Sequence, residues 1–560
     1  MSGVDDDVLP AAQTPVGRAL AELTAPGGEF PLREETVGGI PMRVYASGPT
    51  TLAEILHASA AFAERPHWAY ADEVRSYGEH LRQVYGLADA LLTQYGLAPG
   101  DRLGIAMRNY PEWSVAFWAA QVAGLVAVPL NAWWTAGELV WAVGDSGARL
   151  VVADGERAPA LVGHVPVVRV RGTGESDARE WAELMASLDP TAGPPPVTVA
   201  PDDLSTILYT SGTTGRPKGA VHTHRNHVTN ALNTMLTARA GLRARGATPG
   251  GPTGVLLTYP LFHIAGLNSL YGQVLTGGSV ATLYRWDRAE ARRLVRTHRL
   301  TGAAGVPTTL GELAEDAIAH PDELGSLNRF AMGGAPIPPE LVRRIGAGLG
   351  PYASNGYGLT ETTSALCANV STDFQAHPDS VGRLAPGADL RIVDPETGAD
   401  VDSGPDRLGE LWFRGPNVVP GYWNDPAATA AAFVDGWFRT GDLGYVERGW
   451  VYVVDRLKDV VIRGGENVYS SQVEAALHEL PWVAEVAVYG VPHPTLGEEV
   501  AVAVRVRPGA TGTVEELQHQ VAERVATFAV PTHVRFWTEP LPRTATGKLL
   551  KRELRDASAG

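Results

Sequence analysis

Residues 209–219 are the part of the chain best suited to bind a phosphate chain. They read Y-T-S-G-T-T-G-R-P-K-G. The glycines allow the backbone to turn tightly, because no Cβ blocks positive-φ conformations. Successive backbone N–H groups in such a turn form an anion-binding concavity. The candidate phosphate-binding residues, which add hydroxyl donors and one mobile positive charge, are Thr210, Ser211, Gly212, Thr213, Thr214 and Lys218.

The segment differs from the common P-loop, whose lysine directly follows its last glycine. Here Lys218 lies three residues after Gly215 and is followed by Gly219. A loop of Gly, Ser and Thr alone is more often a solvated turn. A strand-like run over 204–209 leads directly into this loop, and this context favours a polyphosphate loop.

A second motif, residues 355–361, has the composition of a base and metal site. It reads N-G-Y-G-L-T-E. The glycines beside Tyr357 would let its ring lie flat against a planar base, and Thr360 offers a hydroxyl donor. Glu361 is a hard oxygen ligand suited to Mg²⁺, which takes only one or two carboxylates. Taken alone, the motif fits an ordinary turn before a helix equally well.

Three further positions carry a chemical and a structural interpretation side by side. Asp442, in G-W-F-R-T-G-D-L, is a double acceptor or a turn residue. Lys548, in L-P-R-T-A-T-G-K, is a reactive cation or a solvated lysine near the C-terminus. His263, in P-L-F-H-I-A-G, is a site residue or simply a buried histidine.

The histidine-rich run H-T-H-R-N-H resembles a metal site only superficially. It contains His222, His224 and His227, with no cysteine nearby and a helix beginning. Helix capping and solvation are therefore the favoured interpretation.

In order and spacing, these motifs resemble the adenylate-forming superfamily over about residues 50–555. That superfamily includes acyl-CoA synthetases, peptide-synthetase adenylation domains and firefly-type luciferases. The stretches G-D-R-L-G-I-A-M-R-N-Y-P-E-W and V-P-L-N-A-W-W are similar to bacterial fatty-acyl-CoA ligase-like members.

The resemblance implies a role for each motif. Lys548, Thr360, Glu361 and His263 would be catalytic, with Glu361 also holding Mg²⁺. Asp442 would hold the ribose and Arg456 the nucleotide, while Lys458 matches a hinge position. The adenine pocket implied by the resemblance consists of Gly334, Ala335, Pro336, Asn355, Gly356 and Tyr357. The acyl pocket walls would include His263, Gly305, Val306, Gly333 and Ala335.

The implied reaction activates a carboxylic acid with ATP and Mg²⁺, then passes the acyl group to coenzyme A. Gly464 and Gly465 resemble a glycine-bearing strand that lines the thiol tunnel of relatives. Ala529 departs from the pattern, since relatives often carry a lysine there. An amine or amino-acid acceptor, as in coronafacic acid ligase-like members, is therefore a second interpretation. The motifs are also compatible with an acyl-nucleotide sensor, an isolated peptide-synthetase adenylation domain and a luciferase-like oxidase.

Composition sets the class of protein. A chain of 560 residues with 44% hydrophobic residues predicts a globular protein of roughly three or four compact units. The formal net charge of −16 argues against a nucleic-acid partner. The single cysteine, Cys367, leaves no intramolecular disulfide and fits a reducing cytoplasm.

Two segments bear on targeting. The acidic N-terminus lacks a signal-peptide pattern. The uncharged segment 113–134 is long enough to raise the question of a membrane span. Its Gly124 and Pro129 favour a buried helix followed by a short strand, so no integral membrane association is expected.

The elements that must position these residues predict an α/β fold. Helical patterns alternate with short apolar runs at 102–107, 126–130 and 150–153, which favours helix-covered parallel sheets. Residues 190–201 read as a connector, and 238–254 as a mobile surface excursion. Short strands at 389–393, 409–414 and 450–454 predict a small β subdomain. A helix at 471–479 and strands at 483–489 and 500–506 predict a small mobile α+β domain.

The expected domain plan follows this order. Residues 1–50 form an N-terminal leader that packs on or trails from the body. Residues 51–455 form the large domain, 456–458 the hinge, and 459–560 the small C-terminal domain that carries Lys548.

Overall fold

The computed structural model describes residues 10–172, 177–210, 216–248, 250–251, 253–350, 353–544 and 548–557. The chain forms two compact units, one of Met1–Asp389 with Phe413–Phe438 and one of Leu390–Trp412 with Arg439–Gly560. Each is described by itself. The domain bounds and the hinge at 456–458 stay predictions.

The first unit contains two large sheets, as the alternating apolar runs predict. One has the order β21 (Gly421–Tyr422), β11 (Lys218–Thr223), β10 (Leu204–Thr210), β6 (Val126–Pro129), β5 (Arg102–Ala106), β7 (Ala148–Asp154), β8 (Val167–Val170) and β9 (Arg179–Glu180). The other has the order β18 (Arg383–Leu384), β17 (Ser364–Val370), β16 (Ala353–Leu359), β15 (Arg329–Gly333), β14 (Gly302–Gly305), β12 (Gly254–Leu257), β13 (Ser279–Thr282), β3 (Pro66–Tyr70) and β4 (Glu73–Ser76). Strands β10, β6, β5, β7, β8 and β9 of the first sheet pair in parallel, as do β16, β15, β14, β12, β13 and β3 of the second. The pairs of β11 with β10 and β21, of β17 with β16 and β18, and of β3 with β4 are antiparallel.

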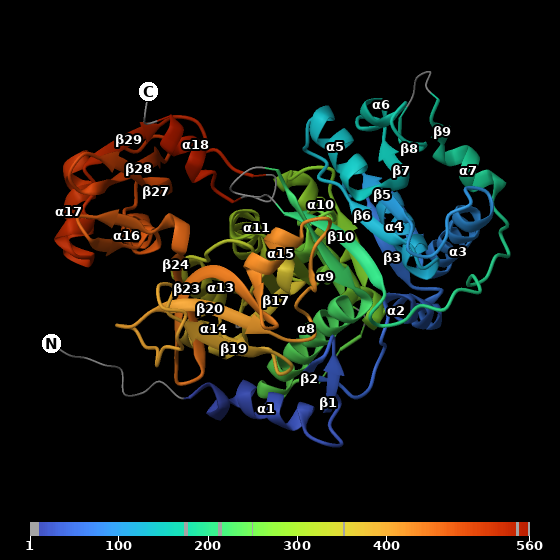
Figure 1. The fold of residues 1–560 in the computed structure, drawn as a ribbon, viewed down its shortest axis with the longest axis horizontal. Helices are drawn as coiled ribbons and strands as arrows, with labels where there is room; N and C mark the ends of the chain where they lie inside the picture. The colour runs from blue at the N-terminus through green and yellow to red at the C-terminus, as the bar shows by residue number, and fades with distance from the viewer. Residues whose placement is uncertain are drawn as a thin grey trace. The chain divides into compact units, whose positions relative to one another are not determined.

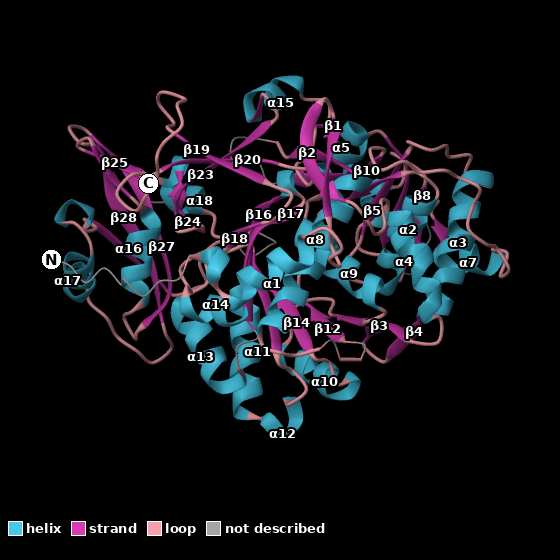
Figure 2. Ribbon diagram, turned by 90° about the horizontal axis from the view of Figure 1, so that it is seen from below, coloured by secondary structure: helices cyan, strands magenta, loops and turns pink. Residues whose placement is uncertain are grey.

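Helices cover these sheets in layers because each strand connection crosses over a sheet face. The main core contains apolar side chains from α2 (Leu52–Ala58), α3 (Tyr77–Thr93), α4 (Pro111–Val122), α8 (His224–Ala244) and α9 (Ile264–Thr276). On the outer face of β5 to β7 lie α5 (Ala136–Ser146) and α6 (Ala158–Leu161) (Figure 1). A third core joins the second sheet to α10 (Arg288–His298), α11 (Pro307–Ala319) and α13 (Pro339–Leu349) (Figure 2). The predicted α/β class is confirmed.

Helix α4 accounts for the long uncharged segment. It starts with Pro111 at its first position, where a missing N–H costs nothing, and every one of its residues is buried. The strand β6 follows, so the predicted helix and strand are confirmed. Among the described residues, no helix combines the length and apolar character needed to cross a bilayer.

Residues 10–50 pack on the first unit. In α1 (Pro15–Thr24), Val16, Ala19 and Leu23 join the main core. A hairpin of β1 (Leu32–Val37) and β2 (Ile40–Tyr45) follows. The Tyr45 hydroxyl donates to Asn233 Oδ1 on α8 at 2.6 Å.

The expectation of a mobile excursion over 238–254 is wrong for its first part. Helix α8 continues through Ala244, and Ala240 and Gly241 are buried. A Cβ added at Gly241 would lie 3.7 Å from Val370 Cγ2 on β17. The small residues there therefore permit close helix–strand packing.

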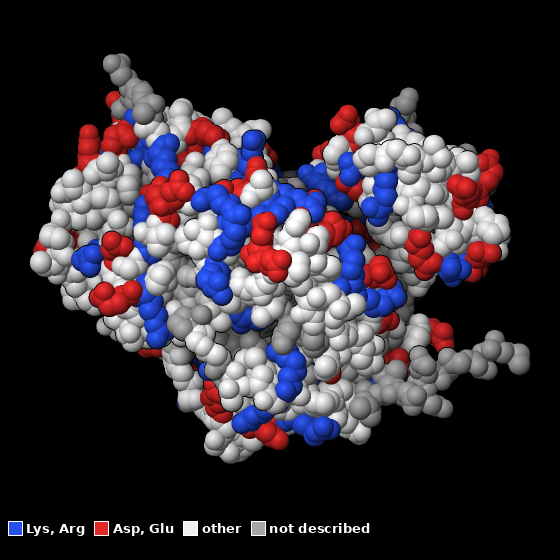
Figure 3. Space-filling view, turned by 180° about the vertical axis from the view of Figure 1, so that it is seen from behind, with Lys and Arg blue, Asp and Glu red and all other residues white. Residues whose placement is uncertain are grey.

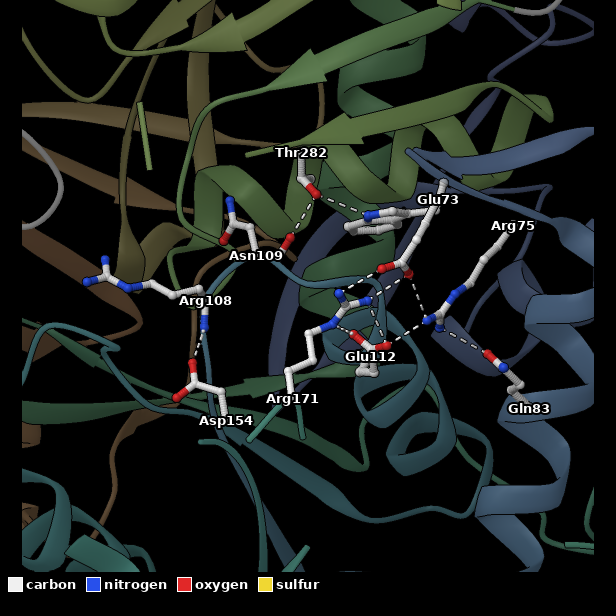
Figure 4. A network of polar contacts seen from close by, with 10 residues as sticks. Glu73, Arg75, Gln83, Arg108, Asn109, Glu112, Asp154, Arg171 and Thr282 are labelled. Carbon is white, nitrogen blue, oxygen red and sulfur yellow. Dashed lines mark hydrogen bonds and ion pairs between the residues drawn. The ribbon is translucent and has the colours of Figure 1, made fainter. Parts of the chain in front are cut away.

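A polar network ties the edge of the second sheet to α4 (Figure 4). The Arg171 guanidinium lies between Glu112 at the start of α4 and Glu73 on β4, with N–O distances of 2.9 and 2.7 Å. Arg75 also bonds Glu112, at 2.6 Å. These ion pairs fix the end of α4 that follows β5.

The second unit is built from two small sheets. In one, β19 (Asp389–Val393), β20 (Gly409–Arg414), β23 (Trp437–Glu447) and β22 (Phe433–Val434) follow in order, and β24 (Trp450–Arg456) pairs with β23. The unit boundary passes through several of these strands.

The other small sheet has the order β26 (Glu466–Val468), β25 (Val461–Arg463), β28 (Gly497–Val506) and β27 (Val483–His493), with β29 (His533–Trp537) beside β28. Its helices are α16 (Ser470–His478), α17 (Val514–Arg524) and α18 (Lys551–Asp556). The predicted helix near 471–479 and both predicted strands are confirmed.

Acidic and basic side chains are interspersed over the face shown in Figure 3. The net charge of −16 is an excess of 62 acidic over 46 basic residues, and both kinds are present on this face.

Candidate active site

The candidate phosphate loop joins two paired strands. β10 and β11 run antiparallel, and Thr210 is the register partner of Lys218. Both ends of the loop are therefore held side by side by a sheet. Ser211, Gly212, Thr213 and Thr214 lie outside the described residues.

Lys218, Glu361 and Tyr422 form a compact cluster beside that loop. β21 pairs with β11, and this pairing places Tyr422 next to the strand that begins with Lys218. The Tyr422 hydroxyl donates to Glu361 Oε1 at 2.7 Å, and Lys218 Nζ lies 5.1 Å from the center of the Tyr422 ring. The arrangement brings a cation and a carboxylate to the base of the loop.

Glu361 is held through both its side chain, by Tyr422, and its backbone. Its residue is 9% exposed, and its carbonyl accepts from Val419 N at 2.9 Å. Burial, followed by the charge of Glu361, raises the pKa of Tyr422 well above its ordinary value. The phenol therefore stays a proton donor to the carboxylate at neutral pH.

His222 supports Thr360, the residue that precedes Glu361. Its Nε2 lies 2.9 Å from the Thr360 carbonyl and its Nδ1 lies 3.1 Å from the Ala220 carbonyl. Burial lowers the pKa of His222 to about 4, so the ring is neutral and carries one N–H. We assign that hydrogen to Nε2, whose contact is shorter, and His222 then donates a hydrogen bond to the Thr360 carbonyl.

The prediction that the three histidines are solvated is wrong. His222, His224 and His227 are all fully buried. The cap of α8 is Thr223, which forms a capping box with Asn226. Within the described part of the chain, no group of three or more His, Cys, Asp or Glu side chains is arranged to hold a metal ion.

The candidate adenine residues lie where β15 ends beside β16. β15 ends at Gly333, which pairs with Gly356 within β16. Gly334 adopts φ +79, a conformation that favours glycine, and Tyr357 lies one residue after Gly356. Gly334, Ala335 and Pro336 thus follow the end of β15, beside the strand that carries Asn355, Gly356 and Tyr357.

His263 caps α9 rather than lying free on a loop. Its Nδ1 accepts from Ala265 N at 3.3 Å, which leaves the hydrogen on Nε2. The preceding loop is held by Asn109, which donates to Tyr259 O at 2.8 Å and accepts from Leu261 N at 2.9 Å. Asn109 stands in the M-R-N-Y-P stretch, and no motif in that stretch predicted that Asn109 holds this loop.

The candidate acyl walls leave little spare room at two glycines. A Cβ at Gly305 would lie 1.9 Å from Thr258 Oγ1, and one at Gly333 would lie 2.8 Å from Gly356 O. Both positions therefore require glycine for close packing.

In the second unit, Asp442 and Arg456 are brought together. They are register partners on β23 and β24, and Arg456 Nε lies 3.0 Å from Asp442 Oδ1. Asp442 is 3% exposed, and its N–H donates to Thr440 Oγ1 at 3.0 Å. A buried carboxylate beside a half-exposed guanidinium has the chemistry to accept from hydroxyls and bind an anion.

Lys458 and Lys548 lie in separate parts of that unit. Lys458 belongs to the short turn Leu457–Asp459, and burial lowers its pKa, while Asp459 opposes the shift. Lys548 N donates to Thr544 Oγ1 at 3.1 Å, and Lys548 O accepts from Thr544 N at 2.8 Å.

One expectation for this unit needs correction. Gly464 and Gly465 do not form a strand; they are the two-residue turn between β25 and β26, with φ +61 and +89. Ala529 is 4% exposed and belongs to the core of the small sheet.

The residues around Glu361 fit Mg²⁺. This cation takes few protein carboxylates and completes its shell with water and phosphate oxygens. Glu361 offers a hard carboxylate and Thr360 lies beside it, next to a loop suited to phosphates. A single fixed carboxylate is therefore a sufficient donor set.

The chain matches known proteins over most of its length. Residues 56–423 match the AMP-binding enzyme family, and residues 472–548 match the AMP-binding enzyme C-terminal domain. A feruloyl-CoA synthase of an Amycolatopsis species is 35% identical over 482 residues, covering 86% of this chain and 93% of that protein. The long-chain-fatty-acid–CoA ligase FadD13 of Mycobacterium tuberculosis is 32% identical over 490 residues, covering 85% and 93%.

Solved structures agree with this likeness. ATP-bound MatB from Rhodopseudomonas palustris superposes with a TM-score of 0.79 at 31% identity, covering 90% of this chain and 98% of that chain. The amide bond synthetase McbA from Marinactinospora thermotolerans gives a TM-score of 0.77 at 28% identity, covering 91% and 100%.

The chain therefore belongs to the AMP-binding enzyme family. It is an acid-activating, AMP-forming ligase.

Proposed function

We propose that this enzyme activates a carboxylic acid with ATP as an acyl-adenylate and then transfers the acyl group to coenzyme A. The observation that carries the proposal is the Lys218–Tyr422–Glu361 cluster at the base of the 211–215 hairpin loop. A cation and a fixed carboxylate close together are the groups that a triphosphate and its metal ion require, and this supports the proposal. Relatives named as CoA ligases for aromatic, fatty and polycyclic acids support the acceptor.

In the first step, a substrate carboxylate oxygen attacks the α-phosphorus of ATP. A new O–P bond forms, the bond to the pyrophosphate oxygen breaks, and pyrophosphate leaves with the electron pair. Because two anions must meet, charge compensation is the main catalytic need. Lys548 bridges the carboxylate and phosphate oxygens, and Lys218 with the loop donors binds the phosphates. When bound at Glu361, Mg²⁺ neutralises charge on the departing pyrophosphate.

Two magnitudes support charge compensation and alignment as the sources of catalysis. A lysine–carboxylate contact at about 4 Å contributes roughly 4 kcal/mol at an effective dielectric of 20. Holding the two reactants in line contributes about 7 kcal/mol or more. Asp442 accepts from the ribose hydroxyls, Arg456 contacts the nucleotide, and Gly334, Ala335, Pro336, Asn355, Gly356 and Tyr357 form the adenine pocket.

In the second step, a thiol sulfur attacks the acyl carbonyl carbon, AMP leaves, and the thiol proton passes to solvent. The small domain, 459–560, turns about the hinge at 456–458 between the steps. His263 lies at the acyl site, and the turn at Gly464 and Gly465 faces the thiol. The single, buried Cys367 supports a cytoplasmic location.

An amine acceptor is the second candidate. Ala529 lacks the charge that relatives often present toward CoA, and the amide bond synthetase McbA is similar in fold. Ala529 itself is buried, so a lysine there would reach a CoA phosphate only at the protein surface. A surface ion pair contributes only about 0–1 kcal/mol, so its absence weakens CoA binding without preventing it. We therefore retain CoA as the main proposal.

The test is acid-dependent pyrophosphate release over a panel of acids, followed by mass analysis with CoA and amino acids present together. We expect an acyl-CoA product. An N-acyl amino acid, with no acyl-CoA even when CoA is the sole acceptor, would favour the amide ligase instead. Failure to release pyrophosphate with any acid would contradict both.

A further inference from the structure

We propose that the seam between α8 and α9 binds an uncharged hydrogen-bonding group, a hydroxyl or a ketone, carried on the body of the acid substrate. The seam is defined by His227, Asn230, Thr234, Asn268 and Tyr271. The inference rests on the proposed function, because it names the class of acid that the enzyme activates.

The two helices lie side by side and antiparallel (Figure 2). Near one end of the contact, the Tyr271 hydroxyl lies 3.3 Å from His227 Nδ1. Near the other, Asn268 Nδ2 donates to Thr234 Oγ1 at 2.9 Å. Asn230 is four residues before Thr234 on α8, so its side chain shares that face of the helix.

Asn230 is the unexplained residue of the seam. It is 1% exposed, and among the described residues neither its Nδ2 nor its Oδ1 has a hydrogen-bond partner. Asn268 Oδ1 on α9 is also buried without one. Asn233 Nδ2 on α8 is buried without one too, although the oxygen of that amide accepts from Tyr45. Buried amides are normally bonded, since leaving them unpaired costs stability. Unpaired amide atoms on both helices of the seam, from Asn230 on α8 and Asn268 on α9, therefore indicate a missing partner.

Each helix of the seam leads to a part of the candidate site, α9 to its cap His263 and α8 to the segment that bonds the Glu361 backbone. α9 begins at its cap His263, and Asn268 lies five residues further, about 7.5 Å along the axis. On α8, Asn226 precedes Asn230 by one turn and donates to Pro416 O at 2.8 Å and Val418 O at 3.1 Å. The next residue, Val419, donates to the Glu361 carbonyl. A substrate that extended from the Asn226 end of α8 toward the His263 cap of α9 would run along this seam.

The chemistry of the seam selects the ligand. An amide offers both a donor and an acceptor, and neither carries charge. Burial holds the pKa of His227 well below its ordinary value, with His222 and His224 adding to the shift, so this ring is neutral as well. A second carboxylate on the acid would find no cation among the seam residues. A plain alkyl chain would leave the amides unpaired, whereas a hydroxyl or ketone would satisfy them.

The test uses pairs of acids that share a skeleton and differ only by one group. Suitable pairs are decanoic acid against its hydroxy and keto derivatives, and 3-phenylpropanoic acid against its ring-hydroxylated form. Pyrophosphate release gives kcat/KM for each acid. We expect at least one oxygenated acid to exceed its partner by about 10- to 100-fold, which is the effect of leaving a buried donor or acceptor unpaired.

Asn230→Leu, which keeps the volume and removes both polar atoms, should abolish that ratio by raising kcat/KM for the plain acid or lowering it for the oxygenated one. Asn268→Leu is the second variant, should the first fail to fold. Thr237→Val is the matched control on the same helix face, because the Thr237 hydroxyl already bonds Asn233 O at 2.8 Å; its ratio should equal that of the wild type.

The outcomes separate this inference from the proposed function. If acids are activated but plain acids are preferred in every pair, or if Asn230→Leu and Asn268→Leu leave the ratio unchanged, water fills the seam and the inference is overturned while adenylation stands. If no acid releases pyrophosphate, the proposed function fails and the inference fails with it.

Discussion

At the scale of single residues, Tyr422 decides how Glu361 is presented. A carboxylate on a short turn has freedom about its side-chain torsions, and a metal ligand works best when that freedom is already lost. The hydroxyl of Tyr422 donates to Glu361 Oε1 at 2.7 Å, which restricts the orientation of the carboxylate. Tyr422 is thus a positioning residue for Glu361.

We expect Tyr422→Phe to weaken use of Mg²⁺ rather than to unfold the protein. Losing a hydrogen bond to a charged group costs about 1.5–3 kcal/mol, which corresponds to roughly 10- to 150-fold. The Mg²⁺ concentration for half-maximal pyrophosphate release should rise, and calorimetry should show weaker Mg·ATP binding.

The matched control is Tyr85→Phe, which also removes one tyrosine hydrogen bond, to His57 Nδ1 at 2.9 Å, in another part of the unit. It should leave the Mg²⁺ dependence unchanged. Equal Mg²⁺ dependence in Tyr422→Phe and the wild type would refute the positioning role.

Motifs with local signals were predictable at this scale, and partners from distant segments were not. Lys218 and Glu361 stand in segments whose glycines and hydroxyls point to phosphate and metal chemistry. Tyr422 stands in a plain G-Y-W run, and only the pairing of β11 with β21 places it at Glu361. Asn109 is similar, because its role depends on a loop 150 residues away in sequence.

At the scale of elements, β11 connects the parts of the site. It begins at Lys218, pairs with β10 and β21, and carries His222 against the Thr360 carbonyl. The strand β11 therefore positions the ends of the candidate phosphate loop, the Tyr422 side chain that bonds Glu361, and the turn at Thr360.

We expect His222→Leu to lower the free energy of unfolding by about 0.5–1.5 kcal/mol, since the Thr360 carbonyl loses one of its two hydrogen bonds and keeps the one from Thr363 N at 3.0 Å. The KM for Mg·ATP should rise because the turn before Glu361 loosens. His222→Gln, whose amide nitrogen can occupy the place of Nε2, should recover most of both effects. Urea unfolding and ATP titration measure them, and a failed recovery by Gln would contradict the hydrogen-bond account.

The end of α8 shows why composition misled the sequence analysis. Gly, Ala and Arg over 238–246 suggest a loop, because glycine lowers helix propensity. Packing overrides that propensity: Leu236 and Ala240 belong to the main core, and Gly241 allows close approach to β17. No local pattern carries this long-range contact.

At the scale of the whole molecule, we expect buried histidines to lower the free energy of unfolding as the pH falls. Burial lowers the pKa of both His222 and His224 to about 4. Below about pH 6.5 the unfolded chain binds protons that the folded chain does not, so unfolding becomes easier as the pH falls. Each histidine removes up to about 3 kcal/mol between roughly pH 6.5 and 4, and nothing above that window.

His224→Asn should flatten the loss of stability over that window, because the asparagine oxygen can still accept from Leu52 N, as His224 Nδ1 does at 3.2 Å. His519→Gln, at a site 74% exposed, is the control and should not change the slope. Urea unfolding at several pH values measures both. A slope that His224→Asn leaves intact would show that other groups cause this loss of stability.

The division into two units predicts that the two half-reactions can be separated by mutation. Lys548 belongs to the second unit, and we propose that it serves adenylate formation only. Lys548→Ala should reduce acid-dependent pyrophosphate release by about 10²–10³-fold, the usual effect of removing one transition-state charge partner. With acyl-adenylate and CoA supplied, the same variant should form thioester at a rate close to that of the wild type. Lys551→Ala is the control, because Lys551 Nζ pairs with Glu474 at 2.9 Å and its loss should lower stability without favouring either half-reaction.

Wild-type pyrophosphate release by a folded Lys548→Ala variant would show that Lys548 takes no part in adenylate formation. An equal loss of both half-reactions would show that Lys548 is not specific to the first one.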